Sequence, residues 1–138
     1  MIDRANIPPV AHNELLARFI VYSEEKRADG TVKHKLFLPY KLIELSVNRH
    51  REATIEETWQ AGRDVAFERQ RTLYGLANIR ASSCRTNKLD VKPDPQLPKN
   101  PNHANIVGYP PTKEDQMALA QILAASIEGK WQEPPAQT

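Results

Sequence analysis

The chain of 138 residues contains little cysteine and no long apolar run. Its single cysteine, Cys84, excludes an internal disulfide framework and is typical of proteins in a reducing cytosol. No segment approaches the roughly 18 consecutive apolar residues that a membrane-spanning helix needs. The first ten residues include Asp3 and Arg4 and lack the apolar core of a secretory signal. We therefore expect a cytoplasmic protein that does not contact a membrane.

Glycine is also scarce, and its placement excludes a phosphate-binding loop. No two of the five glycines fall at the G-x-G or G-x-x-x-x-G-K spacing. The four histidines and Cys84 show none of the C-x-x-C, H-x-x-x-H or H-E-x-x-H spacings that metal sites use. The sequence therefore predicts no metal site and no cofactor.

Neither sign of charge predominates, because the chain has 19 Lys and Arg residues and 17 Asp and Glu residues. A net charge of +2 alone implies no particular partner. About 40% of the residues are hydrophobic, which is enough for a packed interior. We expect one domain over residues 1–133, since a chain of this length usually forms a single core.

A β-hairpin over residues 15–40 is the strongest local prediction. Two apolar segments flank Asp29-Gly30, a dipeptide that favours a two-residue type I′ turn. Pairing Ala28 with Thr31 brings four apolar residues onto one face of the hairpin, as a half-buried sheet requires: Phe19, Val21, Leu36 and Leu38.

Four more strands follow from alternation of apolar and polar residues. We expect them over 42–48, over 73–83, at "KLDV" (88–91) and at "ANIVGY" (104–109). The proline-rich segment 93–101 predicts an extended surface strap, because proline is excluded from helix interiors and central strands. Residues 134–138 predict a disordered tail.

The first predicted helix covers residues 54–71. Thr54 and Glu57 have the spacing of a capping box. Helical periodicity places five residues on one apolar stripe: Ile55, Trp59, Gly62, Val65 and Ala66. The glycine on this stripe predicts a close approach to the sheet.

The second predicted helix covers residues 113–128, with Thr112 as the N-cap and Gly129 as the C-cap. It is apolar nearly all round its axis, which predicts burial on more than one side. A protein partner or a second copy of the chain would cover the surplus. The candidate partner-binding residues are Met117, Leu119, Ile122, Leu123 and Ser126.

Basic residues form a second candidate surface. If they converge in space, they can neutralise several phosphates of a nucleic acid. The candidates are Lys33, Lys35, Arg49, Arg51, Arg80 and Arg85, with Tyr22, Phe37 and Tyr40 as stacking surfaces.

His103 is the third candidate, in the segment "NPNHANIVGYP" (100–110). Asparagine and proline are typical turn residues, so a structural role is one interpretation. The other is an acid–base role, with Asn102, Asn105, Tyr109 or Arg49 lining a pocket. Such a role needs an orienting partner, which the sequence does not identify.

The expected fold class is therefore α+β, a mostly antiparallel sheet of about five strands with two helices packed on it. The leading functional hypothesis is a non-catalytic interaction module or subunit of a larger prokaryotic assembly, bound through the last helix. Nucleic-acid binding is the alternative, and a small enzyme with a His103-centred site is the second alternative.

Overall fold

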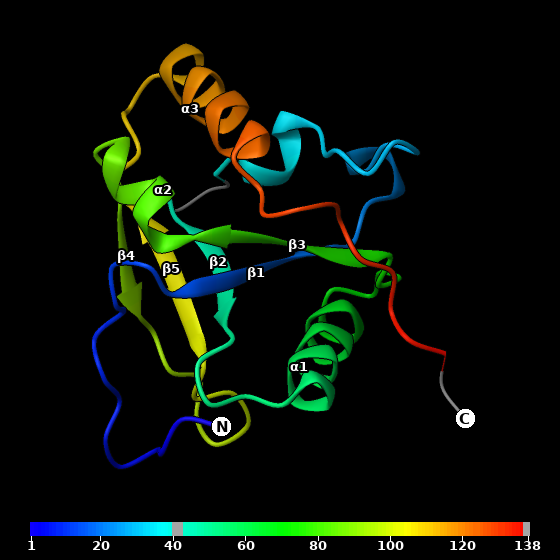
Figure 1. Ribbon diagram of the computed structural model, residues 1–138, viewed down its shortest axis with the longest axis vertical. Helices are drawn as coiled ribbons and strands as arrows, with labels where there is room; N and C mark the ends of the chain where they lie inside the picture. The colour runs from blue at the N-terminus through cyan, green and yellow to red at the C-terminus, as the bar shows by residue number, and fades with distance from the viewer. Residues whose placement is uncertain (40–42, 137–138) are drawn as a thin grey trace.

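The computed structural model describes residues 1–39 and 43–136. Their centre is a five-stranded sheet in the order β3-β1-β2-β5-β4, with every neighbouring pair antiparallel (Figure 1). The strands are β1 (Leu15–Ile20), β2 (Leu45–Arg49), β3 (Gly75–Arg80), β4 (Asp90–Pro93) and β5 (His103–Val107). The predicted α+β class with an antiparallel sheet is confirmed.

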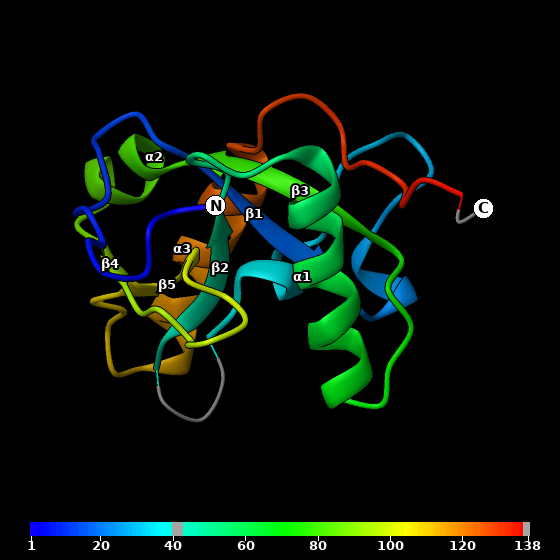
Figure 2. The ribbon, with the colours of Figure 1, turned by 90° about the horizontal axis from the view of Figure 1, so that it is seen from below.

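Helices cover the two faces of the sheet. They are α1 (Ile55–Glu68), α2 (Ala81–Thr86) and α3 (Lys113–Ala125), with two 3-10 turns, η1 (Ser23–Glu25) and η2 (His34–Phe37). Helix α3 and η2 lie on one face, and α1 lies on the other, below the end of the sheet that β1 and β3 form (Figures 1 and 2).

The side chains of β1 point alternately to the two faces of the sheet and pack into the apolar cluster on each face. Leu16 and Ile20 point to the α3 side and join the larger apolar cluster. Ala17 and Phe19 point to the α1 side and pack with Trp59. Because both faces of β1 carry apolar residues, the strand is stable only where packed layers cover both faces of the sheet.

Helix α1 begins as predicted. The Thr54 side chain accepts from the backbone N–H of Glu57, and the Glu57 side chain accepts from the backbone N–H of Thr54. Gly62 packs against Phe19, whose ring carbon would lie 2.8 Å from an added Cβ. Ile55, however, is 77% exposed, so the predicted stripe is wrong at its first residue. The helix has not yet met the sheet in its first turn.

The predicted hairpin over residues 15–40 is wrong beyond its turn. Chain reversal does occur, with a bridge between Lys26 and Val32 and a positive φ at Gly30. The pairing is one residue out of the predicted register, and residues 34–37 form η2 instead of a strand. Strand β1 pairs with β2 and β3, and η2 packs Leu36 and Phe37 into the core on the α3 side.

The other predicted segments are modified at their ends. The strand expected over 73–83 stops at Arg80 and continues as α2. Helix α3 ends at Ala125, before the predicted C-cap at Gly129. The segment expected to be an extended strap begins with Pro93 of β4 and then folds back, with a bridge between Gln96 and Asn100. Of the predicted tail, 134–136 have no regular structure, and 137–138 lie outside the described residues.

Candidate functional site

The predicted partner-binding residues of α3 do not form one surface. Leu123 is fully buried, and Leu119 packs against the core beneath the helix. Met117 and Ser126 are half-buried, and Ile122 is 45% exposed. The side of α3 that carries Ala120, Leu123 and Ala124 is buried in the core, and Ile122 lies outside it. The surplus of apolar surface on α3 is therefore smaller than the sequence suggests, and partner binding through this helix stays a prediction.

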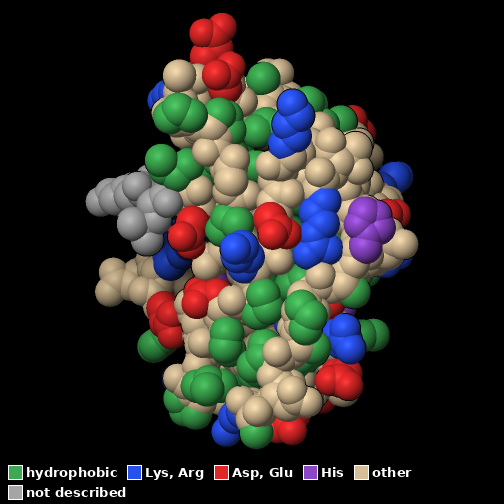
Figure 3. Space-filling model, turned by 90° about the vertical axis from the view of Figure 1, so that its left-hand side faces the viewer, with side chains coloured by type: hydrophobic (Ala, Val, Ile, Leu, Met, Phe, Trp, Pro, Cys, Tyr) green, Lys and Arg blue, Asp and Glu red, His purple; other side chains and the backbone are tan. Residues whose placement is uncertain are grey.

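The predicted basic residues separate into three places. Lys33 and Lys35 lie at η2, where Lys35 pairs with Glu24 at 3.2 Å. Arg85 on α2 pairs with Asp90 and donates to the Val10 carbonyl. On the side that carries α2 and β4, positive and negative side chains alternate without a large patch of one sign (Figure 3).

The remaining three basic residues lie where β1 begins and β2 and β3 end. Arg49 is fully buried and binds the Glu14 carboxylate and two proline carbonyls, so it holds the N-terminal segment in place. Arg51 and Arg80 are exposed and line an open hollow together with His50. Of the proposed stacking residues, Phe37 is buried and Tyr40 lies outside the described residues.

The residues suggested as companions of His103 are mostly structural. Asn102 is buried and donates to the carbonyls of Arg49 and Arg51. Tyr109 is buried with its hydroxyl donating to the Phe37 carbonyl at 2.8 Å, and burial raises the pKa of this phenol. Of these suggested companions, Asn105 is linked to the His103 imidazole, because both side chains contact the Asp94 carboxylate.

His103 itself is the first residue of β5, and its side chain is 5% exposed. Nδ1 lies 2.9 Å from the backbone carbonyl of Asp94 and 3.2 Å from the Asp94 carboxylate. Asn105 donates to the same carboxylate at 3.0 Å and fixes it. Because both neighbours of Nδ1 are acceptors, we assign the proton to Nδ1, which leaves Nε2 as an acceptor. The orienting partner that an acid–base histidine needs is therefore present.

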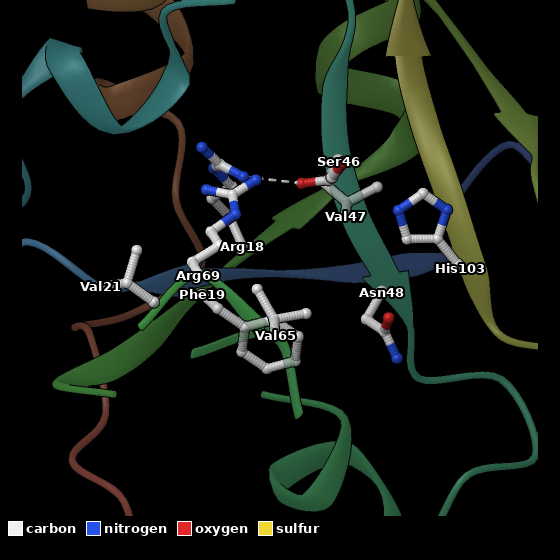
Figure 4. Close-up of a pocket in the computed structure, with 9 residues that line it drawn as sticks. All are labelled: Arg18, Phe19, Val21, Ser46, Val47, Asn48, Val65, Arg69 and His103. Carbon is white, nitrogen blue, oxygen red and sulfur yellow. Dashed lines mark hydrogen bonds between the residues drawn. The ribbon is translucent and has the colours of Figure 1, made fainter. Parts of the chain in front are cut away.

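His103 lines a small pocket on the α1 side of the sheet (Figure 4). Ser46 and Asn48 of β2 form the floor beside it, and Val65 and Arg69 of the α1 segment lie opposite. The enclosed space is about 20 Å³, room for roughly one water-sized group. Only the tip of a ligand can enter, and the rest must remain at the mouth.

Arg18 borders the same pocket from β1: its side chain leaves the strand on the α3 side, like Leu16 and Ile20, and reaches the pocket past the end of the β1–β2 ladder. The ladder between β1 and β2 ends after Ala17 and Asn48, which leaves the Ser46 carbonyl to a side-chain donor. Arg18 Nη1 donates to that carbonyl at 3.0 Å, and Nε donates to the Leu36 carbonyl at 2.9 Å (Figure 4). These two bonds use two of its five N–H groups. The other three have no acceptor among residues 1–39 and 43–136.

The charges around Arg18 are incompletely balanced. Burial lowers the Arg18 pKa to about 10, with Glu25 opposing the shift and the nearby Arg69 guanidinium adding to it. Arg69 makes no side-chain hydrogen bond or ion pair within the described part of the chain. Burial raises the pKa of Glu25, whose carboxylate has no salt bridge within 4.0 Å among those residues. The pocket thus presents two guanidinium groups and one oriented imidazole.

Sequence reasoning did not identify Arg18, Arg69 or Asp94. The signal for Arg18 was present, because an arginine stands at core-facing parity between Leu16 and Ile20. Asp94 and Arg69 carry no such signal, because tertiary packing alone brings their segments beside the pocket.

The described residues contain no group of three or more His, Cys, Asp and Glu side chains suited to a metal ion. Cys84 is buried, and burial raises its pKa to about 12, so its thiol is not an activated nucleophile. In the described part of the chain, no helix is long and apolar enough to cross a membrane.

Comparisons with models of known protein families, with curated proteins and with solved structures find no match to this chain.

Proposed function

We propose that the protein binds the phosphate group of an organic phosphate ester at the mouth of the pocket between β2, β5 and the end of α1, with one phosphate oxygen entering the pocket, and that His103 accepts a proton there. The observation that carries this proposal is Arg18. Two backbone carbonyls hold its guanidinium in place, while three of its N–H groups lack an acceptor among the described residues beside Arg69 and His103.

The charge of the pocket favours phosphate over a carboxylate. Guanidinium groups bind both anions through paired N–H donors. Two guanidinium groups at one small pocket match a dianionic phosphate monoester better than a singly charged carboxylate. Glu25 does not neutralise both arginines. In the part of the chain that the structure describes, its carboxylate forms no ion pair within 4.0 Å with Arg18 or Arg69.

The proton chemistry follows from the tautomer of His103. With Nδ1–H directed at Asp94, Nε2 is the free acceptor on the ring. An imidazole oriented by a carboxylate is the usual arrangement of a general base. A hydroxyl of the ligand, or a water beside the bound phosphate, would lose its proton to Nε2.

NMR titration with inorganic phosphate tests the binding. We expect the backbone amide signals of Ser46, Asn48 and His103 to shift, and acetate at matched ionic strength to shift them less. Arg69→Ala should weaken binding at least tenfold without lowering the melting temperature. Arg63→Ala removes the same charge from α1 outside the pocket and is the control. Equal affinity in Arg69→Ala and Arg63→Ala would contradict the proposal.

Hydrolysis of bis(p-nitrophenyl) phosphate and p-nitrophenyl phosphate tests the role of His103. His103→Gln should abolish turnover while phosphate still shifts the Ser46 and Asn48 signals. Turnover that persists in His103→Gln would assign the reaction to another group.

Protein binding through α3 is a second proposal, with a narrower basis than the sequence suggested. Its outer side carries a short apolar strip of exposed residues, Ala118, Ile122 and Ala125. A second copy of the chain or a subunit of a larger prokaryotic assembly would cover this strip. Light scattering coupled to size exclusion tests the self-association: Ile122→Asp should dissociate an oligomer, whereas Gln121→Asp should not. A monomeric wild-type protein at high concentration would rule out the homo-oligomer.

A further inference from the structure

A second cationic hollow lies on the same face of the sheet as the His103 pocket. It is open, has a volume of about 420 Å³ and is lined by His50, Arg51, Arg80, Asn13 and Glu14 among others. Arg51 and Arg80 are 41% and 42% exposed at their side chains. The hollow therefore presents positive charge to solvent.

The acids near this hollow leave Arg51 largely unneutralised. Glu14 is 3.8 Å from Arg51, but its carboxylate already binds the buried Arg49 through both oxygens. Arg80 pairs with Glu128 at 3.3 Å, at a site where both side chains are about half exposed. Such exposed pairs contribute little to stability, so a phosphate can replace Glu128 at little cost.

Strand β2 connects the hollow to the pocket. Alternate residues of a strand point to one face, and Ser46, Asn48 and His50 therefore lie in a row on the α1 side. At about 3.3 Å per residue, Ser46 and His50 are roughly 13 Å apart. Asn48 lies between them and pairs with Asn100 of the segment after β4, with a bond of 2.7 Å.

This arrangement requires a ligand with more than one anionic group. Positive charge at both ends of the row suits phosphates spaced along a chain. Between them, Asn48 is buried and bonded to Asn100, while the half-buried amide of Asn100 keeps one N–H for the hydrogen-bonding edge of a base or sugar. Because the pocket encloses only about 20 Å³ and His103 is 5% exposed, the end of a flexible single strand can reach it more readily than a rigid duplex.

Building on the proposed function, we propose that the phosphate ester is a single-stranded nucleic acid, with its dianionic terminal phosphate at Arg18 and Arg69 and a later phosphate of the same strand at Arg51 and Arg80. The strand follows β2 from the His103 pocket to the hollow. Of the basic residues that the sequence suggested for nucleic-acid binding, Arg51 and Arg80 would contact it, and the buried Arg49 would not.

Fluorescence anisotropy with labelled ten-nucleotide RNA and DNA strands that carry a terminal phosphate, and with a duplex of the same sequence, tests this inference. We expect the single strands to bind at least tenfold more tightly than the duplex at low salt. Arg51→Gln with Arg80→Gln should weaken strand binding at least tenfold. Each lost phosphate contact should reduce the slope of log affinity against log salt by roughly 0.7.

This design distinguishes failure of the phosphate-binding proposal from failure of the single-strand inference. The double variant should bind inorganic phosphate at the pocket as the wild type does, because Arg18 and Arg69 are unchanged. Strand binding that is unaffected by the double variant, or no tighter than phosphate binding, would overturn the single-strand inference and leave the phosphate pocket standing. Loss of phosphate binding in wild-type protein would overturn both. Thermal melts of each variant exclude unfolding as the cause.

Discussion

Individual charged residues connect the layers of this protein as well as lining its pockets. Arg49 lies at the end of β2, fully buried, and joins β2 to the segment of residues 8–14 through Glu14 and two carbonyls. Arg18 joins β1 to β2 and η2 in the same way, but with N–H groups left over. Arg49 uses four of its five N–H groups within the fold, whereas Arg18 uses two and has more donors left for a ligand.

Replacement of Arg49 by leucine should lower the free energy of unfolding by about 3–5 kcal/mol, because it leaves the buried Glu14 carboxylate with only the Ala11 N–H and the more distant Arg51 as partners. Urea denaturation measures this loss. Arg51→Leu is the control, since the Arg51 side chain is 41% exposed and 3.8 Å from Glu14, and it should cost about 0.5 kcal/mol or less. Equal losses in the two variants would show that the Arg49–Glu14 contact is not a buried ion pair.

Glu25 should make stability depend on pH. Burial raises its pKa above the ordinary value of 4.5, against the opposing charge of Arg18. The unfolded chain then loses this proton at lower pH than the folded chain, so wild-type stability falls as pH rises from 4.5 through the raised pKa. Glu25→Gln lacks this loss. The free energy of unfolding of the variant relative to wild type should therefore be more favourable at pH 7 than at pH 4. A constant difference across this range would show that the Glu25 pKa is not raised.

At the scale of elements, two segments show how packing decides orientation. Helix α3 is apolar around most of its axis, yet the sheet and η2 cover the side that carries Ala120, Leu123 and Ala124. Residues 34–37 look like part of a strand, but they form η2 and place Leu36 and Phe37 in the core. In both cases the element takes the geometry that buries the larger apolar area.

Two neighbouring residues on α3 should differ sharply in their contribution to stability. Leu123→Ala should cost about 2–5 kcal/mol, because it leaves a cavity at a fully buried position. Ile122→Ala should cost less than about 1 kcal/mol, because that side chain is 45% exposed. Chemical denaturation of both variants measures the difference. Similar costs would mean that an unseen partner covers Ile122 in solution.

At the scale of the whole molecule, the sheet separates two apolar layers. The larger apolar cluster lies between the sheet and α3 with η2, and the smaller one lies between the sheet and α1. The pocket that we propose as the ligand site is lined by Ser46 and Asn48 of β2, His103 of β5, and Val65 and Arg69 of the α1 segment. Cys84 belongs to the larger cluster and has no access to solvent.

Cys84 should therefore report global unfolding. Its thiol is buried with a pKa of about 12, so reaction with Ellman's reagent needs an opening of the structure. We expect very slow labelling in buffer and a steep rise with urea that follows the loss of tryptophan fluorescence. Fast labelling well below the unfolding midpoint would show that α2 opens locally.

The sequence by itself determined the class of fold, the approximate positions of β2, β4 and β5, and the capping box that begins α1, because alternation and capping depend on residues close together in the chain. It also placed Thr112 at the start of α3. Tertiary structure alone decided the partners of β1, the buried side of α3 and the meeting of Arg18, Arg69 and His103 with Asp94. The Asp29-Gly30 turn favours a local partner for β1, but β1 pairs instead with β2 and β3, which follow much later in the sequence. Contacts of that kind depend on which arrangement hides the most apolar surface, and no short stretch of residues carries that information.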